Sequence, residues 1–221
     1  MDTEGETMKV VPAVLAEKFD DFVKRVRQAE SFTDYIQVDL MDGVFVETRS
    51  FSPERINSIE TPLSFEVHLM AEDPLGFLNG MVHPGLKKVI FHCETGVSHL
   101  DLVRSIRERG LSPGVAIKPE TELTRCREIA KQVDTLLFLT VDPCCYGSPF
   151  KPEVLKKIIE ARRLFPAKLI SVDGGVSLDN LKDFFDAGVD YACVGSRIFL
   201  QEDPGKSYRL FQQKVQELEH R

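Results

Sequence analysis

Apolar and polar residues alternate in short runs that recur along the chain, and longer stretches with helical spacing separate these runs. In residues 36–40 the apolar side chains fall at every second position, so they face one side of a strand. Gln37 and Asp39 face the other side. Residues 17–28 instead place Phe19, Phe22 and Val26 on one face of a helix. The pattern therefore predicts alternating strands and helices.

The predicted strands cover residues 10–15, 35–40, 64–69, 88–92, 113–117, 135–141, 168–172 and 191–194. The predicted helices cover residues 17–28, 53–59, 98–109, 122–132, 152–164, 178–187 and 204–218, and one more begins at Asp73-Pro74. Ser52 is expected to cap the helix that starts at Pro53.

About eight strands alternating with about eight helices predict the α/β class and a single-domain (β/α)8 TIM barrel. A doubly wound open sheet is the competing architecture, and it normally has a glycine-rich turn after its first strand. Residues 12–16 contain no glycine. We therefore expect residues 9–221 to form the barrel, and residues 1–8 to be a disordered N-terminal segment.

The bulk composition is typical of a soluble globular protein, because the 221 residues are 43% hydrophobic and 29% charged. The net charge of -7 argues against nucleic acid or an acidic membrane surface as a partner. No apolar run approaches the length of a membrane span. A small anionic substrate remains compatible with this charge, because backbone N–H groups can hold a small anion.

The cysteines are odd in number and scattered, which favours reduced thiols and a cytoplasmic location. They are Cys93, Cys126, Cys144, Cys145 and Cys193. No metal-ligand spacing surrounds the adjacent pair Cys144-Cys145, so we expect ordinary loop thiols there.

Three ionisable residues lie at the ends of apolar strands, where barrel enzymes place their chemistry: Asp39, His68 and Asp173. A buried carboxylate is costly unless it is paired, so neither aspartate suits pure packing. The residues alone leave two alternatives open, which are a hydrogen-bonded core histidine at position 68 and a purely structural pairing of the aspartates.

Two carboxylates that face each other suit proton transfer at carbon, because one can remove a proton while the other supplies one to the opposite face. The carbanion formed between these steps needs a metal ion or hydrogen-bond donors at its adjacent oxygen. Asp39, His68 and Asp173 also provide the oxygen and nitrogen ligands that hold divalent cations.

A second cluster follows the last two strands, where barrels commonly bind phosphate through loop N–H groups and the start of a short helix. Gly174-Gly175 follows the seventh strand, and Gly195-Ser196 follows the eighth. These four residues are the predicted phosphate site.

Over residues 11–199 the chain resembles the ribulose-phosphate 3-epimerase family. The matching motifs are Val38-Asp39-Leu40-Met41-Asp42-Gly43-Val44-Phe45-Val46, Val67-His68-Leu69-Met70, Val172-Asp173-Gly174-Gly175-Val176 and Val194-Gly195-Ser196. The related sugar-phosphate decarboxylases carry a lysine between two aspartates, and no lysine lies between Asp39 and Asp42.

The resemblance implies a barrel that epimerises a ketose phosphate at C3 through an enediolate. It also implies one divalent metal ion, held by His-x-Asp on the second strand, a histidine on the third and an aspartate on the seventh. Asp39, His68 and Asp173 match this set, but Gln37 stands where the family has its first histidine. An amide oxygen is a weaker ligand than imidazole for zinc or iron, so metal binding is predicted to be weak or absent. No organic cofactor is expected.

Other departures from the family lie at the same end of the barrel. Ala13 replaces a serine, and Asp142-Pro143-Cys144-Cys145-Tyr146-Gly147 replaces the lid Asn-Pro-Gly-Phe-Gly-Gly. The sequence therefore leaves two hypotheses. The first is an epimerase for ribulose 5-phosphate or a related pentulose or hexulose phosphate. The second is a catalytically idle barrel that binds a phosphorylated metabolite without turnover.

For the epimerase, the resemblance assigns catalysis to Asp39 and Asp173 and makes a phosphorylated sugar the partner. It assigns substrate binding to Met41, His68, Met70, Gly147, Gly174, Gly175, Gly195 and Ser196. A homo-oligomer is expected from the resemblance alone, since no segment of the sequence identifies an interface.

Overall fold

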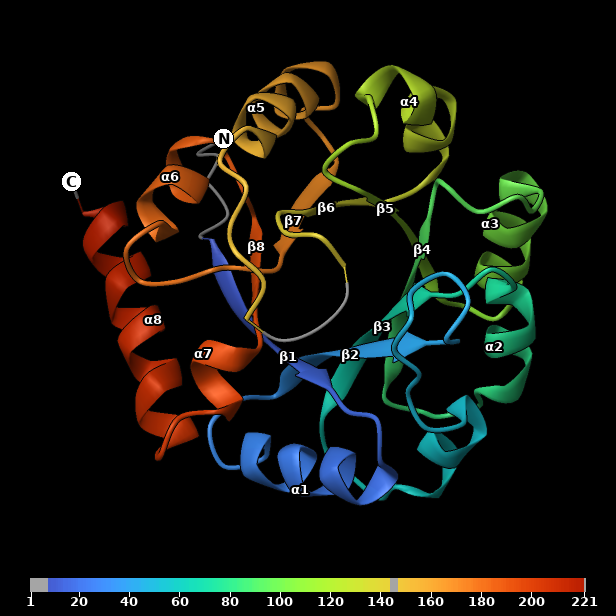
Figure 1. The fold of residues 1–221 in the computed structure, drawn as a ribbon, viewed down its shortest axis with the longest axis horizontal. Coiled ribbons are helices and arrows are strands. Elements are labelled where there is room, and N and C mark those ends of the chain that lie inside the picture. The colour runs from blue at the N-terminus through green and yellow to red at the C-terminus, as the bar shows by residue number, and fades with distance from the viewer. Residues whose placement is uncertain (1–7, 144–146, 221) are drawn as a thin grey trace.

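The computed structural model describes residues 8–143 and 147–220. Its parallel strands form one closed barrel in chain order, β1 to β8, and the helices surround the barrel (Figure 1). The strands are β1 (Lys9–Leu15), β2 (Tyr35–Met41), β3 (Ser64–Met70), β4 (Leu86–His92), β5 (Ser112–Ile117), β6 (Thr135–Leu139), β7 (Leu169–Asp173) and β8 (Tyr191–Val194). The helices are α1 (Phe19–Ala29), η1 (Pro53–Ser58), α2 (Pro74–Gly80), α3 (His99–Glu108), α4 (Leu123–Gln132), α5 (Val154–Leu164), α6 (Leu181–Asp186), α7 (Ser196–Phe199) and α8 (Pro204–Glu219).

The predicted fold class, a single-domain (β/α)8 barrel, is confirmed. Alternation along each strand produces it, because one set of side chains packs under the helices and the other set points into the barrel. On β2, the buried residues Ile36, Val38 and Leu40 belong to the large core that lies between strands and helices. A smaller cluster includes Val11, Ala13, Ile90, Ala116, Leu137, Leu139 and Cys193, and it fills the interior of the barrel.

Two predicted details of the elements are wrong. Ser52 does not cap η1 through its side chain, because its hydroxyl instead contacts the carboxylate of Glu54. The helix expected from residue 178 begins at Leu181. There the side chain of Asn180 accepts a hydrogen bond from the backbone of Ser177 at 2.8 Å, and this local turn replaces the first helical turn.

The barrel interior also holds charged groups near the N-terminal ends of the strands. Lys88 on β4 forms an ion pair of 2.8 Å with Glu66 on β3, and the hydroxyl of Tyr35 on β2 donates to the same carboxylate oxygen at 2.9 Å. Lys88 and Glu66 are both buried, so each compensates the charge of the other. This cluster forms the floor beneath the residues at the opposite end.

The prediction of reduced cysteines is wrong for one pair. Cys93, which follows β4, and Cys126 on α4 form a disulfide. The two residues are 33 positions apart, and the pairing of β4 with β5 brings the two segments that carry them close together. Cys193 is a buried free thiol. Cys144 and Cys145 lie outside the described residues.

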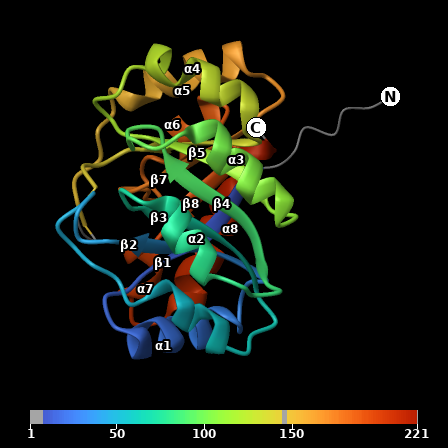
Figure 2. The ribbon, with the colours of Figure 1, turned by 90° about the vertical axis from the view of Figure 1, so that its right-hand side faces the viewer.

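The expected N-terminal segment is described only at its last residue, Met8, which is buried in the core. Residues 1–7 lie outside the described part of the chain. In the side view of Figure 2, β4 points toward the left, the side on which the C-terminal strand ends lie. Among the described helices, none combines the length and the apolar character that crossing a membrane requires.

Candidate functional site

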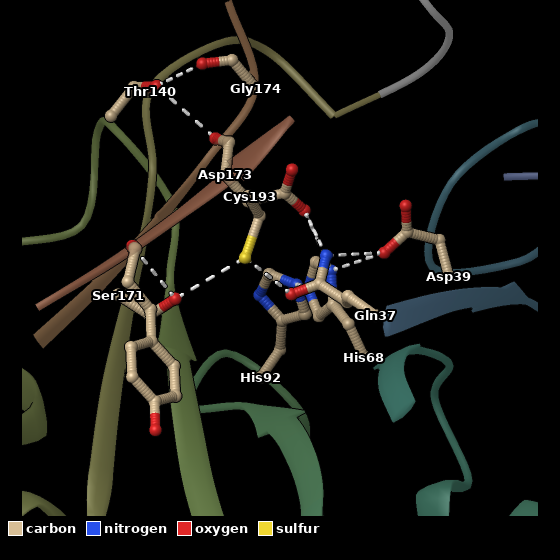
Figure 3. A network of polar contacts seen from close by, with 10 residues as sticks. Gln37, Asp39, His68, His92, Thr140, Ser171, Asp173, Gly174 and Cys193 are labelled. Carbon is tan, nitrogen blue, oxygen red and sulfur yellow. Dashed lines mark hydrogen bonds and ion pairs between the residues drawn. The ribbon is translucent and has the colours of Figure 1, made fainter. Parts of the chain in front are cut away.

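Asp39, His68 and Asp173 converge inside the barrel near the C-terminal ends of their strands (Figure 3). The pairing of β2 with β3 places Asp39 directly beside His68. Asp173 reaches them across the barrel from the end of β7. One ligand atom from each residue lies within 4.8 Å of the others. The structure therefore brings together the three residues that the sequence singled out.

The amide of Gln37 joins the two carboxylates. Its Nε2 atom donates to Oδ1 of Asp39 and to Oδ2 of Asp173, each at 2.8 Å. Its Oε1 atom accepts a hydrogen bond of 3.1 Å from the thiol of Cys193 on β8. Gln37 therefore presents N–H donors, and not its carbonyl oxygen, to the acid pair.

His68 lies beneath the same two oxygens and is fully buried. Its Nδ1 atom is 3.2 Å from Oδ1 of Asp39 and 3.3 Å from Oδ2 of Asp173. On the other side of the ring, its Nε2 atom is 2.9 Å from Nε2 of His92, and Nδ1 of His92 is 3.0 Å from Glu94. A continuous hydrogen-bonded chain thus runs from the acid pair to Glu94.

The environment moves the pKa values of these groups apart. Burial, together with the charge of Asp173, raises the pKa of Asp39 to about 6, although hydrogen bonds from His68 and Gln37 oppose this shift. Burial by itself would lower the pKa of His68. Its hydrogen bonds with Asp173 and Asp39 outweigh burial and raise its pKa to about 9. His68 is therefore positively charged near neutral pH.

The pKa values of His92 and Glu94, the pair at the outer end of this chain, are both lowered. Burial is the main cause that lowers the pKa of His92 to about 4; the hydrogen bond with Glu94 opposes this shift, and the charge of His68 adds to it. Burial would raise the pKa of Glu94. Hydrogen bonds from His92, Thr121 and the backbone of Lys118 outweigh that effect and hold the pKa of Glu94 at about 2. His92 is therefore neutral and Glu94 is ionised.

Three residues of this site suit a divalent cation, and a fourth does not. Asp39, His68 and Asp173 form a set that can hold such an ion. The fourth group, the Nε2 atom of Gln37, has two N–H donors and no lone pair to offer, and it contacts both carboxylates. The residues do not fit a cation while Gln37 keeps this orientation.

Most of the predicted substrate residues line one small cavity of about 70 Å³ at this end of the barrel. The predicted residues on its wall are Asp39, Met41, Met70, Gly147, Asp173, Gly174, Gly175, Gly195 and Ser196. His68 lies behind the two aspartates. A larger cavity of about 650 Å³ opens at the N-terminal end, among residues such as Tyr35, Lys88 and Tyr191. We place the candidate site in the small cavity, because the acid pair and the C-terminal strand ends are there.

The loop after β7 depends on two glycines. Gly174 has φ of 95° and Gly175 has φ of 63°, a region that side chains other than glycine rarely adopt. A Cβ atom on Gly174 would lie 2.4 Å from the Cγ2 atom of Val141. Thr140 donates a hydrogen bond of 3.2 Å to the backbone oxygen of Asp173 and also contacts the oxygen of Gly174. These contacts fix the loop beside the acid pair.

Sequence reasoning missed the partners of the central residues. Cys193 drew attention only as a thiol, and neither His92 nor Glu94 was assigned a role in the site. The signal for Cys193 was alternation, because residues 191 and 193 face the barrel interior when 192 and 194 face the helices. The signal for His92 was its position on β4, next to the strand that carries His68.

Comparison with known proteins identifies the relatives of this chain. Residues 9–199 match the Ribulose-phosphate 3 epimerase family. A ribulose-phosphate 3-epimerase of Mycobacterium bovis is 31% identical over 203 residues, which cover 88% of this chain and 87% of that protein. The cytoplasmic isoform of ribulose-phosphate 3-epimerase from Oryza sativa subsp. japonica is 28% identical over 215 residues, which cover 94% of each chain.

The fold is also shared with a different enzyme. The crystal structure of 3-hexulose-6-phosphate synthase from Salmonella typhimurium matches with a TM-score of 0.70 and 19% identity, over 96% of this chain and 100% of that one. Similarity at this level of identity concerns the fold alone. Family membership rests on the sequence match: the chain belongs to the ribulose-phosphate 3-epimerase family.

Proposed function

We propose that this protein is a ketose-phosphate 3-epimerase in which Asp39 and Asp173 exchange protons with substrate carbon. The observation that supports it best is the apposition of the two carboxylates, whose oxygens accept hydrogen bonds from one amide nitrogen at 2.8 Å each. Two carboxylates held at one point, one buried and the other partly buried, are costly in a protein that only binds a ligand. Proton transfer on opposite faces of a carbon atom is chemistry that such a pair suits.

In this mechanism one carboxylate removes the proton from C3 of the sugar, and the electron pair of the broken C–H bond moves into the enediolate. The other carboxylic acid then gives its proton to C3 from the opposite face, so the configuration at C3 is inverted. A pKa near 6 suits Asp39 to this task, because both of its protonation states are accessible near neutral pH. No step of this mechanism passes through a metal ion.

We assign substrate binding to the residues that line the same cavity. Met41 and Met70 would flank the enediolate, with His68 holding the carboxylates from below. The phosphate would lie on the loops that contain Gly174, Gly175, Gly195 and Ser196, and Gly147 would lie on the facing loop. At about 70 Å³ the cavity is smaller than the roughly 300 Å³ of ordinary ligand pockets, so its walls must move apart to admit a sugar phosphate.

We further propose that a divalent ion, which Asp39, His68 and Asp173 would hold, binds only weakly. A bound ion would supply positive charge beside the enediolate oxygen. The inward N–H groups of Gln37 argue against tight binding. The functional unit would be residues 9–221, in keeping with a family match over residues 9–199. A cytoplasmic location is proposed from the relative in Oryza sativa, which is named as a cytoplasmic isoform.

Proton exchange in deuterated water tests the function. Purified protein is incubated with a panel of pentulose and hexulose phosphates, and mass spectrometry measures deuterium at C3. We expect incorporation with at least one sugar and none with the double variant Asp39→Asn/Asp173→Asn. Absence of exchange with every sugar in the panel would eliminate the epimerase.

One alternative has a specific observation in its favour. Gln37 places an amide against both acids, and an idle barrel that binds a phosphorylated metabolite could tolerate this without loss. Tight binding of a sugar phosphate without exchange, unchanged by Asp39→Asn, would support that alternative.

A further inference from the structure

Gln37 has a fully buried side chain whose polar atoms are all engaged. Both protons of its amide go to carboxylate oxygens, at 2.8 Å each, and its oxygen accepts from Cys193 at 3.1 Å. The three partners come from three strands, β2, β7 and β8. A single amide thus connects both walls of the acid site, as Figure 3 shows.

The orientation of this amide follows from its neighbours. The two carboxylate oxygens that face this amide accept hydrogen bonds, so an amide turned by half a revolution would place its own acceptor oxygen against two acceptor oxygens. The observed orientation instead makes two hydrogen bonds of 2.8 Å to these oxygens.

Cys193 completes the arrangement from the other side. Burial raises the pKa of its thiol, and the nearby acids Glu66 and Asp173 raise it further, so the sulfur keeps its proton. The hydroxyl of Ser171 is 3.4 Å from this sulfur and donates to the backbone oxygen of Tyr191 at 3.3 Å. The proton of the thiol is therefore available to Oε1 of Gln37.

We propose that Cys193 and Gln37 together replace the cation of this site: the thiol fixes the direction of the amide, and the amide holds the two carboxylates in apposition without metal. Cys193 is then a positioning residue, which acts on the acid pair through Gln37. Catalysis by the acid pair without metal rests on the proposed function. The exclusion of metal by the amide of Gln37 is independent of that function.

The cost of admitting a cation supports this inference. To coordinate it, Gln37 would have to turn Oε1 toward the carboxylates and give up both N–H···O bonds. Its N–H groups would then face the sulfur of Cys193, which is a weak acceptor. The preference of a thiol for donating over accepting therefore stabilises the metal-free arrangement.

Metal binding is tested on chelator-treated, full-length protein by calorimetric titration with Zn²⁺ and Mn²⁺, together with elemental analysis. We expect no tight site in the wild type. Gln37→Glu keeps the shape of the side chain, removes both N–H donors and adds a carboxylate, so it should bind at least about 100-fold more tightly. Gln37→His is a second variant with an imidazole ligand, in case a third acid at this point prevents folding.

Cys193→Ala isolates the contribution of the thiol. One hydrogen bond that fixes the amide is lost, so metal affinity should rise by about 2- to 10-fold above the wild type. Ser171→Ala is the matched control, because it removes a buried hydroxyl beside the same sulfur but leaves the bond to Gln37 in place. Its metal affinity should equal that of the wild type.

A spectroscopic measurement reports the amide directly. In NMR spectra of the wild type, the two side-chain amide protons of Gln37 should exchange slowly with solvent, should be missing from Gln37→Glu, and should keep their positions when one equivalent of Zn²⁺ is added. Stoichiometric zinc binding that shifts these protons would overturn the inference. So would an epimerase activity that chelation abolishes and Mn²⁺ restores, and that result would leave the proposed function intact.

Discussion

The Nε2 atom of His68 lies 2.9 Å from the Nε2 atom of His92, and this contact fixes where the protons of both rings reside. Glu94 is an ionised acceptor 3.0 Å from Nδ1 of His92, so that nitrogen carries a proton. Nε2 of the neutral His92 therefore has no proton and carries a lone pair, and the Nε2–H group of His68 donates a hydrogen bond to it. His68 is left with its Nδ1–H group directed at the acid pair.

Removing Glu94 should destabilise the protein. Glu94→Ala leaves the Nδ1–H group of His92 and the backbone N–H of Lys118 without their acceptor, at a cost of about 2–4 kcal/mol in the free energy of unfolding. Urea denaturation measures it. Glu94→Gln is the control, because it keeps an acceptor oxygen and should lose less.

The difference in the free energy of unfolding between the wild type and Glu94→Ala should depend on pH. The pKa of Glu94 is lowered from 4.5 to about 2 in the folded protein, so its stabilising contribution is present above pH 4.5 and is lost as the pH falls toward 2. The difference in the free energy of unfolding between the wild type and Glu94→Ala should therefore become smaller as the pH falls from 4.5 toward 2. An equal gap at pH 7 and pH 3 would contradict the assigned role.

The strands and the acids could be predicted from the sequence because both leave a local signal. The alternation of apolar and polar residues predicts β2. A carboxylate within this apolar strand indicates that Asp39 does more than pack. The partners of these residues leave no such signal. The contact of Gln37 with Cys193 joins residues 156 positions apart. It depends on barrel closure and on the rotation of one amide, neither of which has a periodicity.

The disulfide was missed for a similar reason. The odd number and irregular spacing of the cysteines favoured free thiols. In the fold, however, Cys93 follows a strand, and the helix that carries Cys126 lies against it. The Gln37 substitution was visible in the sequence, yet its chemical result was not. An amide can present oxygen or nitrogen, and only the positions of Asp173 and Cys193 decide between them.

The rate of epimerisation should depend on the ionisation of Asp39. Its pKa is raised from 3.8 to about 6, so kcat/KM for the epimer whose C3 proton Asp39 removes should fall as the pH drops through about 6 and the carboxylate becomes protonated. Gln37→Leu removes a hydrogen bond that lowers this pKa, so its acid limb should move to higher pH. An acid limb near pH 4 in the wild type would contradict the assignment.

The glycine at position 174 should resist substitution. Gly174→Ala combines a positive φ of 95° with a Cβ atom 2.4 Å from Val141, and we expect a loss of about 2–4 kcal/mol in stability. Gly110→Ala is the matched control, because Gly110 has φ of 73° but no atom within 4 Å of the added Cβ. It should lose only about 1–2 kcal/mol. Equal losses in urea denaturation would show that the contact with Val141 is unimportant.

The Cys93–Cys126 disulfide should contribute measurably to stability. It links residues 33 positions apart, and a bond that closes a loop of this size contributes about 2–4 kcal/mol. Reductant should lower the unfolding midpoint of the wild type but leave a Cys93→Ser/Cys126→Ser double variant unchanged. Peptide mapping of unreduced protein should recover the two cysteines as one linked pair, and recovery of both as free thiols would refute the bond.

The roles of the two acids can be separated by isotope exchange. If Asp39 and Asp173 act on opposite faces of C3, each one removes the proton from only one of the two epimers. Asp39→Asn and Asp173→Asn should both abolish epimerisation, by at least about 1,000-fold in kcat.

Each variant should nevertheless retain one half-reaction. In deuterated water, Asp39→Asn should still incorporate deuterium into the epimer that faces Asp173, with its configuration retained, and Asp173→Asn should do so with the other epimer. Mass spectrometry of each recovered epimer measures this. If both variants exchange the same epimer, a single acid serves both faces, and the second carboxylate acts only by shaping the hydrogen bonds of Gln37 and His68.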